Sequence, residues 1–229
     1  MDAFNGYHIR RKFCATAVVY SDASDSGFGG FSTLVGDHVS FGHWNEFEAS
    51  QSSIFKELKA LLHALQSFSA VLSHHKVNWF SDSQNSCRIV SEGTSKPELR
   101  AITKEIFEVC MSFDIAMEIE WLPRSQNDKA DYLSRIVDLD DWSMSAALFQ
   151  LVVSSWGPHT VDRFASFYNT QVPRFSYSRF WNPESEVVEA FTQDWSRDNN
   201  WLCPPVSIIV RAVRHLIASK GVGGLIITK

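Results

Sequence analysis

The apolar residues between positions 54 and 72 constrain the fold of this chain more than any other feature. They follow a spacing of four, three, four, three and four residues, at Ile54, Leu58, Leu61, Leu65, Phe68 and Leu72. This spacing puts them on one face of a helix, so we predict a long amphipathic helix over residues 53–73. A helix with one apolar face needs a second apolar layer to cover it, and the flanking segments have the pattern of β-strands.

Three short β-rich runs separated by turn residues precede this helix, and two more strand patterns follow it. We expect strands near residues 14–22, 27–34, 38–44, 76–82 and 115–122. Further helices are expected over 83–92, from Pro97 onward, and near 127–135. Strands joined through helices pair in parallel, whereas the opening meander pairs antiparallel. The order therefore predicts an α/β fold with a mixed five-stranded sheet and flanking helices.

The sequence changes character near residue 136. Residues 137–229 hold five of the eight tryptophans, and an acidic segment, Asp138–Asp141, lies at the change. We therefore expect two units, 1–136 and 137–229. The second is expected to be a small Rossmann-like β-α-β segment. Its predicted elements are a helix at 141–155, a strand at 160–164, helices at 184–191 and 207–219, and a strand at 224–228.

Composition excludes several classes of protein. Hydrophobic residues make up 45% of the chain and charged residues 21%, which is typical of a globular protein. No apolar run approaches the ~18 residues of a membrane span, so we expect no membrane partner. The polar N-terminus resembles no signal peptide, so an intracellular location is expected, with cytoplasm and nucleus left open. The four cysteines form no CxxC pair, which argues against structural zinc.

The net charge of −5 is unusual for a protein that would hold nucleic acid by charge alone. A cluster of carboxylates that metal ions neutralise would account for it. Asp22 and Asp82 both stand at the tip of a predicted strand, where ligand sites of α/β sheets gather. Glu57 lies at the edge of the buried helix face, and Asp131 lies in the first turns of the last helix.

Each carboxylate alone has an ordinary explanation. An aspartate after a strand is commonly a turn or cap residue, and Glu57 has Lys56, Lys59 and Arg88 as potential partners. Together, however, the four acids have the composition of a site for two hard divalent cations, which lie ~4 Å apart where they cleave phosphodiesters.

Four segments of the first unit follow one another in the order of a known family. They are Tyr20–Gly30, Glu57–Leu61, Phe80–Ser83 and Asn127–Arg135. In this order they resemble the motifs of the ribonuclease H domain of retrotransposon polyproteins, over residues 14–136. The resemblance implies a ribonuclease H-like sheet and an endonuclease that cleaves the RNA strand of RNA–DNA hybrids. A reverse transcriptase domain of the parent polyprotein is then a further expected partner.

The resemblance also implies roles for individual residues. Asp22, Glu57, Asp82 and Asp131 correspond to the catalytic carboxylates that bind two Mg²⁺ or Mn²⁺ ions. Substrate contacts are expected from Gly29, Gly30, Ser83, Arg124 and Asn127.

One departure from the family concerns the segment before the last motif. Cellular members carry a histidine there, whereas this chain has Leu122–Gln126. Arg124 either stands near the substrate phosphate or is a solvated loop arginine. The missing histidine and the acidic charge leave an alternative open, namely an inactive module that binds nucleic acid or protein.

Residues beyond 160 resemble the region that follows ribonuclease H in DIRS-like retrotransposons, which is similar to adenine-N6 DNA methyltransferases. In those enzymes a polar residue precedes two prolines and an aromatic residue follows them, so that both hold a flipped base. Here Cys203 and Val206 occupy these positions, and no Gly-rich loop follows the strand at 160–164. We therefore expect a degenerate segment that binds no S-adenosylmethionine and packs some of its tryptophans against the first unit.

Overall fold

The fold was analysed in a computed structural model, which describes residues 14–34, 38–136, 144–176, 182–183 and 185–225. The strands in this part of the chain are β1 (Ala17–Ala23), β2 (Gly27–Ser32), β3 (His38–His43), β4 (Lys76–Ser81), β5 (Ala116–Trp121), β6 (Val161–Asp162), β7 (Asn199–Leu202) and β8 (Val222–Leu225). The α-helices are α1 (Glu46–Ala49), α2 (Ser53–Leu72), α3 (Gln84–Glu92), α4 (Pro97–Ser112), α5 (Asp128–Ser134), α6 (Ala146–Trp156) and α7 (Ile209–Ala218). Short 3₁₀ helices are η1 (Arg124–Gln126), η2 (Ala190–Thr192) and η3 (Val206–Ile208).

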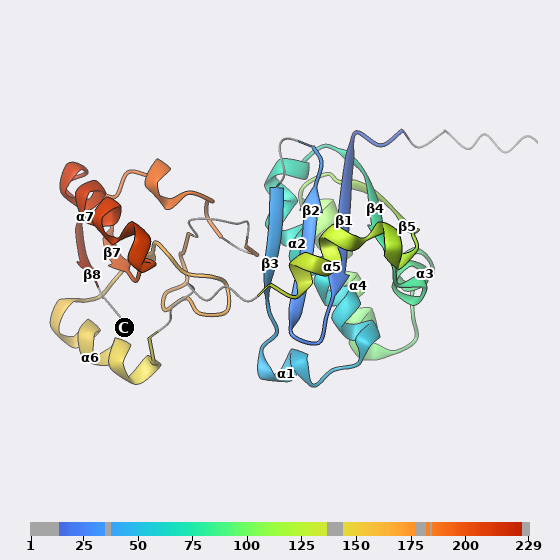
Figure 1. Cartoon of the computed structure of the whole chain (residues 1–229), viewed down its shortest axis with the longest axis horizontal. Coiled ribbons are helices and arrows are strands. Elements are labelled where there is room, and N and C mark those ends of the chain that lie inside the picture. Colours follow the sequence, from blue (N-terminus) through green and yellow to red (C-terminus); the bar gives the residue numbers. More distant parts are fainter. Residues whose placement is uncertain (1–13, 35–37, 137–143, 177–181, 184, 226–229) are drawn as a thin grey trace, which may run out of the picture.

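The larger sheet of the described chain has five strands in the order β3-β2-β1-β4-β5 (Figure 1). β1 pairs antiparallel with β2, and β2 with β3, while β4 pairs in parallel with both β1 and β5. The predicted mixed five-stranded sheet is therefore confirmed, as is the long helix, observed as α2. The sequence pattern did not predict α1, a four-residue helix whose N-cap Asn45 and Glu48 form a capping box.

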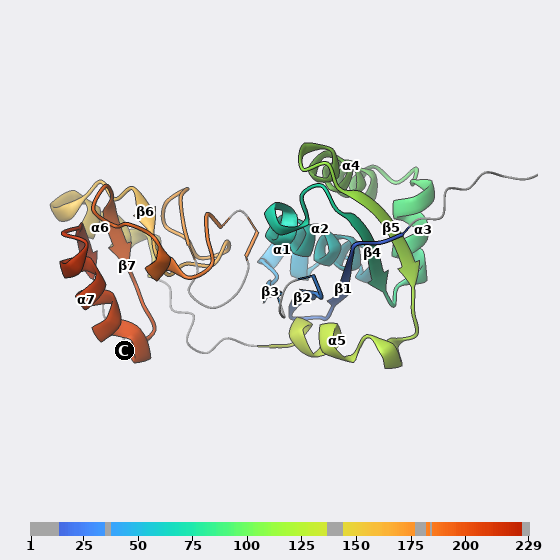
Figure 2. The ribbon, with the colours of Figure 1, turned by 90° about the horizontal axis from the view of Figure 1, so that it is seen from above.

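The core of this sheet lies under α2. Leu58, Leu65 and Phe68 are completely buried against strand residues such as Val19 and Trp79. Each fully buried side chain of this kind contributes about 2 kcal/mol. Figure 2 shows α5 on the opposite face of the sheet, where it packs on β1 and β2. The sheet is thus covered on both faces, and the ends of β1 and β4 lie between α2 and α5.

A second sheet in the described residues is parallel throughout, with the order β6-β7-β8. β7, α7 and β8 form a β-α-β crossover, but its first strand is β7 and not the strand expected at 160–164, which is observed as β6. Strand β7 itself was not predicted, because its residues are too few to show a period. The helix predicted at 184–191 is wrong, because Glu189 adopts a left-handed backbone with φ of 66° and only η2 follows it. The acidic segment at 138–141 lies outside the described residues.

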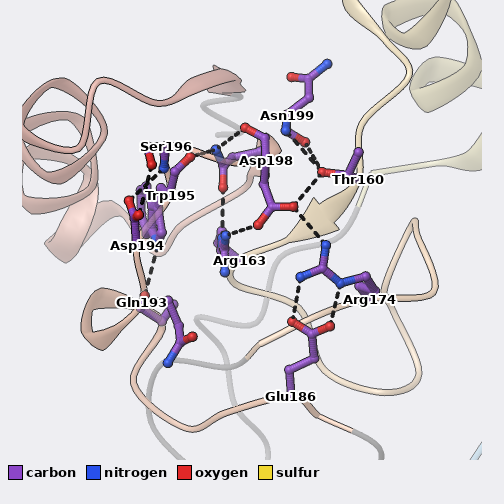
Figure 3. Close-up of polar contacts among 12 residues, drawn as sticks. Thr160, Arg163, Arg174, Glu186, Gln193, Asp194, Trp195, Ser196, Asp198 and Asn199 are labelled. Carbon is purple, nitrogen blue, oxygen red and sulfur yellow. Dashed lines mark hydrogen bonds and ion pairs between the residues drawn. The ribbon is translucent and has the colours of Figure 1, made fainter.

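Charged side chains hold the second sheet together (Figure 3). Arg163 is 2% exposed, and it donates hydrogen bonds of 2.8 Å to both Asp198 and Asn200. Arg174 donates 2.8 Å to the other carboxylate oxygen of Asp198 and also pairs with Glu186. Since a buried guanidinium is costly without partners, this network is the compensation that allows Arg163 to lie inside.

The two sheets meet through aromatic side chains of the segment after β6. The ring of Phe167 lies 5.0 Å from that of His63 and 5.8 Å from that of Phe28, and it belongs to a cluster with Trp44. Tyr168 contacts His43 at the end of β3. The expected packing of the two segments is thus observed, but through phenylalanine and tyrosine.

The tryptophans of the second segment play a different part from the one we expected. Trp195 and Trp201 are buried in clusters of their own segment, and Trp156 is 64% exposed. Trp142 and Trp181 lie outside the described residues. Within the described chain, no helix combines the length and the apolar character needed to cross a bilayer.

Candidate active site

Three carboxylates meet at the edge of the larger sheet where β1 and β4 end. Asp22 belongs to β1, Asp82 directly follows β4, and Glu57 lies in the second turn of α2. Each offers an oxygen atom within 4.8 Å of those of the other two. Because parallel strands present their carboxyl ends at the same edge, two sequence positions sixty residues apart become neighbours. Clustered carboxylate oxygens are the ligands that Mg²⁺ and Mn²⁺ prefer, so this set fits a divalent cation.

The fold disfavours negative charge on two of these acids. Burial, with repulsion by Asp82, raises the pKa of Asp22 to about 7, although Ser134 Oγ donates a hydrogen bond of 2.9 Å to it. Burial and the nearby charges of Asp22 and Asp82 raise the pKa of Glu57 to about 9. The lysines and arginine that could have neutralised Glu57 pair elsewhere: Lys56 with Asp25, Lys59 with Glu48, and Arg88 with Glu92.

Asp131, the fourth predicted carboxylate, is not part of the three-carboxylate cluster. Its Oδ1 atom accepts hydrogen bonds of 2.6 Å from Arg124 and from Arg135. Although partial burial opposes the effect, these two hydrogen bonds lower the pKa of Asp131 below its usual value. Arg124 comes from η1 and Arg135 from the end of α5, so Asp131 joins two neighbouring segments.

The two predicted glycines have a packing role. Gly29 and Gly30 are buried in β2, where they pair with residues of β1 and β3. A Cβ atom on Gly29 would lie 2.3 Å from the backbone nitrogen of Ser134, and one on Gly30 would lie 2.8 Å from Cβ of Ala64. They thus allow α5 and α2 to approach the sheet, whereas the substrate contact expected from them stays a prediction.

Ser83 and Asn127 likewise have structural partners. Ser83 is the N-cap of α3, and its hydroxyl accepts the backbone N–H of Ser86. Asn127 is 1% exposed, and its Nδ2 atom donates 3.1 Å to the carbonyl oxygen of Ser21. This bond ties the start of α5 to the residue before Asp22. Asn127 therefore supports the site from inside the fold, and Ser83 holds the helix that follows Asp82.

Sequence reasoning gave no site role to three residues around the cluster. Ser134 binds Asp22, Arg135 binds Asp131, and Lys56 lines the cleft beside Glu57. The i, i+4 spacing of Asp131 and Arg135 was an available signal for their ion pair. No comparable sequence signal marks Ser134, because its contact depends on how α5 is placed on the sheet.

Residues 14–137 match the model of a family described as reverse transcriptase-like. The chain belongs to this family. The match covers the whole five-stranded sheet and all four predicted carboxylates of this reverse transcriptase-like protein. No curated protein matches the chain.

Several solved structures are similar to about half of the reverse transcriptase-like chain. LC11-RNase H1, isolated from compost by a metagenomic approach, is 23% identical, with a TM-score of 0.43 over 52% of this chain and 93% of that one. RNase H1 from Halobacterium salinarum NRC-1 is 20% identical, with a TM-score of 0.40 over 51% and 91%. A foamy viral protease-reverse transcriptase in complex with RNA/DNA hybrid is 17% identical, with a TM-score of 0.41 over 52% and 19%.

Two cavities of different size lie in the segment that resembles methyltransferases, and the larger, of about 390 Å³, is lined by Trp156, Asn199 and Val222–Gly224. Asp162, at the end of β6, and Cys203, after β7, line a space of about 10 Å³. That is room for about one water molecule, whereas pockets for organic ligands measure about 300–1,000 Å³. The absence of S-adenosylmethionine binding stays a prediction.

Proposed function

We propose that this chain is a metal-dependent endoribonuclease that cleaves the RNA strand of RNA–DNA hybrids. The observation that carries the proposal is the convergence of Asp22, Glu57 and Asp82 within 4.8 Å at the end of two parallel strands. The order of the sequence motifs adds the substrate class, since this order resembles the ribonuclease H domain of retrotransposon polyproteins. We further propose that a reverse transcriptase domain of a parent polyprotein is its natural partner.

The cluster supports this chemistry in the following way. Asp22, Glu57 and Asp82 would hold Mg²⁺ or Mn²⁺ through their carboxylate oxygens. The bound cation supplies an activated water and stabilises the leaving oxygen of a phosphodiester. Ser134 orients Asp22 through its hydrogen bond, and Asn127 fixes the adjacent backbone at Ser21. Burial of Asp22 keeps its carboxylate in one position and excludes bulk water from it.

A second ion would need a ligand beyond these three acids. Asp131 is the candidate, but it must first leave Arg124 and Arg135. We therefore propose that Asp131 exchanges between the arginines and the cluster when substrate phosphate competes for the guanidinium groups. The ion pairs of Asp131 also favour the alternative function, an inactive module that binds nucleic acid or protein, because they occupy a carboxylate that the active enzyme requires.

The decisive experiment compares Asp82→Asn with the parent chain on a labelled RNA–DNA hybrid in Mg²⁺. The substitution preserves shape and removes one ligand charge, so we expect cleavage to fall by about 10²–10⁴-fold, the equivalent of several kcal/mol of transition-state stabilisation. Folding should be unaffected, as checked by circular dichroism. Asp128→Asn is the matched control, because Asp128 is exposed in the same motif and lies outside the cluster. A parent chain that binds hybrid in Mg²⁺ without cleaving it would instead support the inactive module.

A further inference from the structure

A cleft of about 390 Å³ opens beside the three-carboxylate cluster. It shares Glu57 and Arg124 with the site described above, and it extends from there along the first turn of α2 and the turn between β1 and β2. Lys56 and Arg135 also line it, together with the small polar residues Ser24, Ser26 and Ser53. This volume exceeds what an isolated ion needs and is typical of a site for one unit of a larger ligand.

Lys56 is the unusual member of the lining. Its side chain is only 10% exposed, and its Nζ atom lies 3.8 Å from Asp25, a residue whose side chain is fully exposed. That distance is beyond hydrogen-bonding range, so this ion pair is weak and screened by water. The ammonium group therefore lines the cleft with one weak partner, and an anion in the cleft would be a closer one.

Two further cationic side chains, Arg124 and Arg135, line the cleft. The guanidinium groups of Arg124 and Arg135 each direct Nη2 to Asp131, and each group has five N–H donors. α2 begins at the cleft with Ser53 and has no acidic residue in its first turn, so its positive dipole end is not neutralised there. Asp25, at the exposed mouth, and Glu57, shared with the cluster, are the acidic members of the lining.

We propose that this cleft binds a backbone phosphate of the nucleic-acid strand that lies over the carboxylate cluster, with Lys56 as its central cation. The inference rests on the proposed function and adds a second contact to it. Because the cleft and the cluster share Glu57, the same strand passes from one to the other. Lys56 is therefore a positioning residue, since it holds one phosphate and so sets which neighbouring phosphodiester reaches the carboxylates.

The test measures binding without cleavage. Fluorescence anisotropy of a short RNA–DNA hybrid is recorded in EDTA, over a range of salt concentrations, for the parent chain and for Lys56→Met. Methionine keeps an unbranched apolar stem and removes the charge. We expect Kd to rise about tenfold and the slope of log Kd against log salt to fall by about one, as for the loss of one phosphate contact. Lys104→Met is the matched control, because Lys104 is an exposed lysine of α4 and pairs with Glu108.

Two further measurements keep the result interpretable. Lys56→Arg restores the charge and should return the salt slope to the parent value, which separates a charge effect from a folding defect in the methionine variant. In Mg²⁺, Lys56→Met should raise KM about tenfold and leave kcat within about twofold. Unchanged binding and salt slope in Lys56→Met, or no hybrid binding by the parent chain, would overturn the proposal. If the parent chain cleaves the hybrid and cleavage does not depend on Lys56, the proposed role of the cleft is refuted and the proposed function stands. If binding depends on Lys56 but no cleavage occurs, the proposed nuclease activity is refuted and the role of the cleft stands.

Discussion

At the scale of single residues, the fold treats the charges of its acidic groups in opposite ways. Asp22 and Glu57 are placed where their charge is disfavoured, with pKa values raised by burial to about 7 and about 9. Asp131, only a short distance along the same surface, is kept charged by two arginines. The electrostatic strain of the site therefore lies at Asp22 and Glu57, whereas two arginines stabilise the charge of Asp131.

This strain predicts how the stability of the metal-free chain depends on pH. Between about pH 4 and 9 the folded chain binds more protons at Asp22 and Glu57 than the unfolded chain, so stability is greatest at the low end and falls as pH rises. We expect Glu57→Gln to remove much of this fall and to raise Tm at pH 9 by on the order of 5 °C. Thermal unfolding in EDTA at pH 5, 7 and 9 measures the Tm of both chains. Glu120→Gln, on exposed β5, serves as control, and a parallel pH dependence in Glu57→Gln and parent would contradict the assignment.

At the scale of elements, β2 decides how closely the helices approach the site. α5 carries Ser134 and Asp131, and it reaches the sheet at Gly29, where no side chain intervenes. Asp22 is paired with Gly29 across the β1–β2 ladder. The position of α5, and with it the hydrogen bond from Ser134 to Asp22, therefore depends on the absence of a Cβ atom at one strand position.

We expect Gly29→Ala to displace α5 and to lower both stability and cleavage. The new Cβ atom would lie 2.3 Å from the nitrogen of Ser134 and 2.5 Å from Cβ of Leu133, and overpacking of this kind costs about 1–3 kcal/mol. Chemical denaturation and hybrid cleavage report the two effects. Gly224→Ala in β8 is the control, because its nearest contact would be an ordinary 3.5 Å. Parent-like stability and cleavage in Gly29→Ala would show that α5 does not need this close approach.

At the scale of the whole molecule, aromatic side chains of the segment after β6 connect the two sheets. Phe167 packs against Phe28 and His63, and a Cβ atom on Gly42 would lie 3.0 Å from its ring. Figure 1 shows the smaller sheet and its helices beyond β3, at the side of the larger sheet away from β5. The second segment thus lies on the β3 side of the larger sheet, and Phe167 joins it to the core beneath β2.

Phe167→Ala is expected to weaken this connection and to cost about 2 kcal/mol, less than for a fully buried phenylalanine because the ring is half-buried. Hydrogen exchange should increase at the amides of β3 and change little in β5. Trp156→Ala supplies the control, because this large aromatic residue is exposed on α6. Unchanged exchange at β3 would mean that the two sheets are held together by other contacts.

Much of the first unit could be predicted because its patterns are local. The apolar face of α2 and the alternation in β5 are visible in short stretches of consecutive residues. The positions of the aspartates at the strand ends follow from parallel pairing. Three features could not be predicted in this way. β7 is too short to show a period, Glu189 breaks a helix through its own backbone angle, and the partners of Arg124 depend on tertiary placement. The aromatic contact of Phe167 is likewise invisible in sequence, since phenylalanine is common in any core.

β3 is one of the two edge strands of the larger sheet, and Phe167 and Tyr168 lie against its last residues, Gly42 and His43. A strand in that position has unpaired amides and carbonyls on one side, which readily recruit a strand from another molecule. The second segment thus shields a surface that would otherwise favour self-association. A shortened chain that ends after α5 keeps the carboxylate cluster but loses that shield. Its β3 edge is then uncovered, so we expect lower solubility and more aggregation at high concentration.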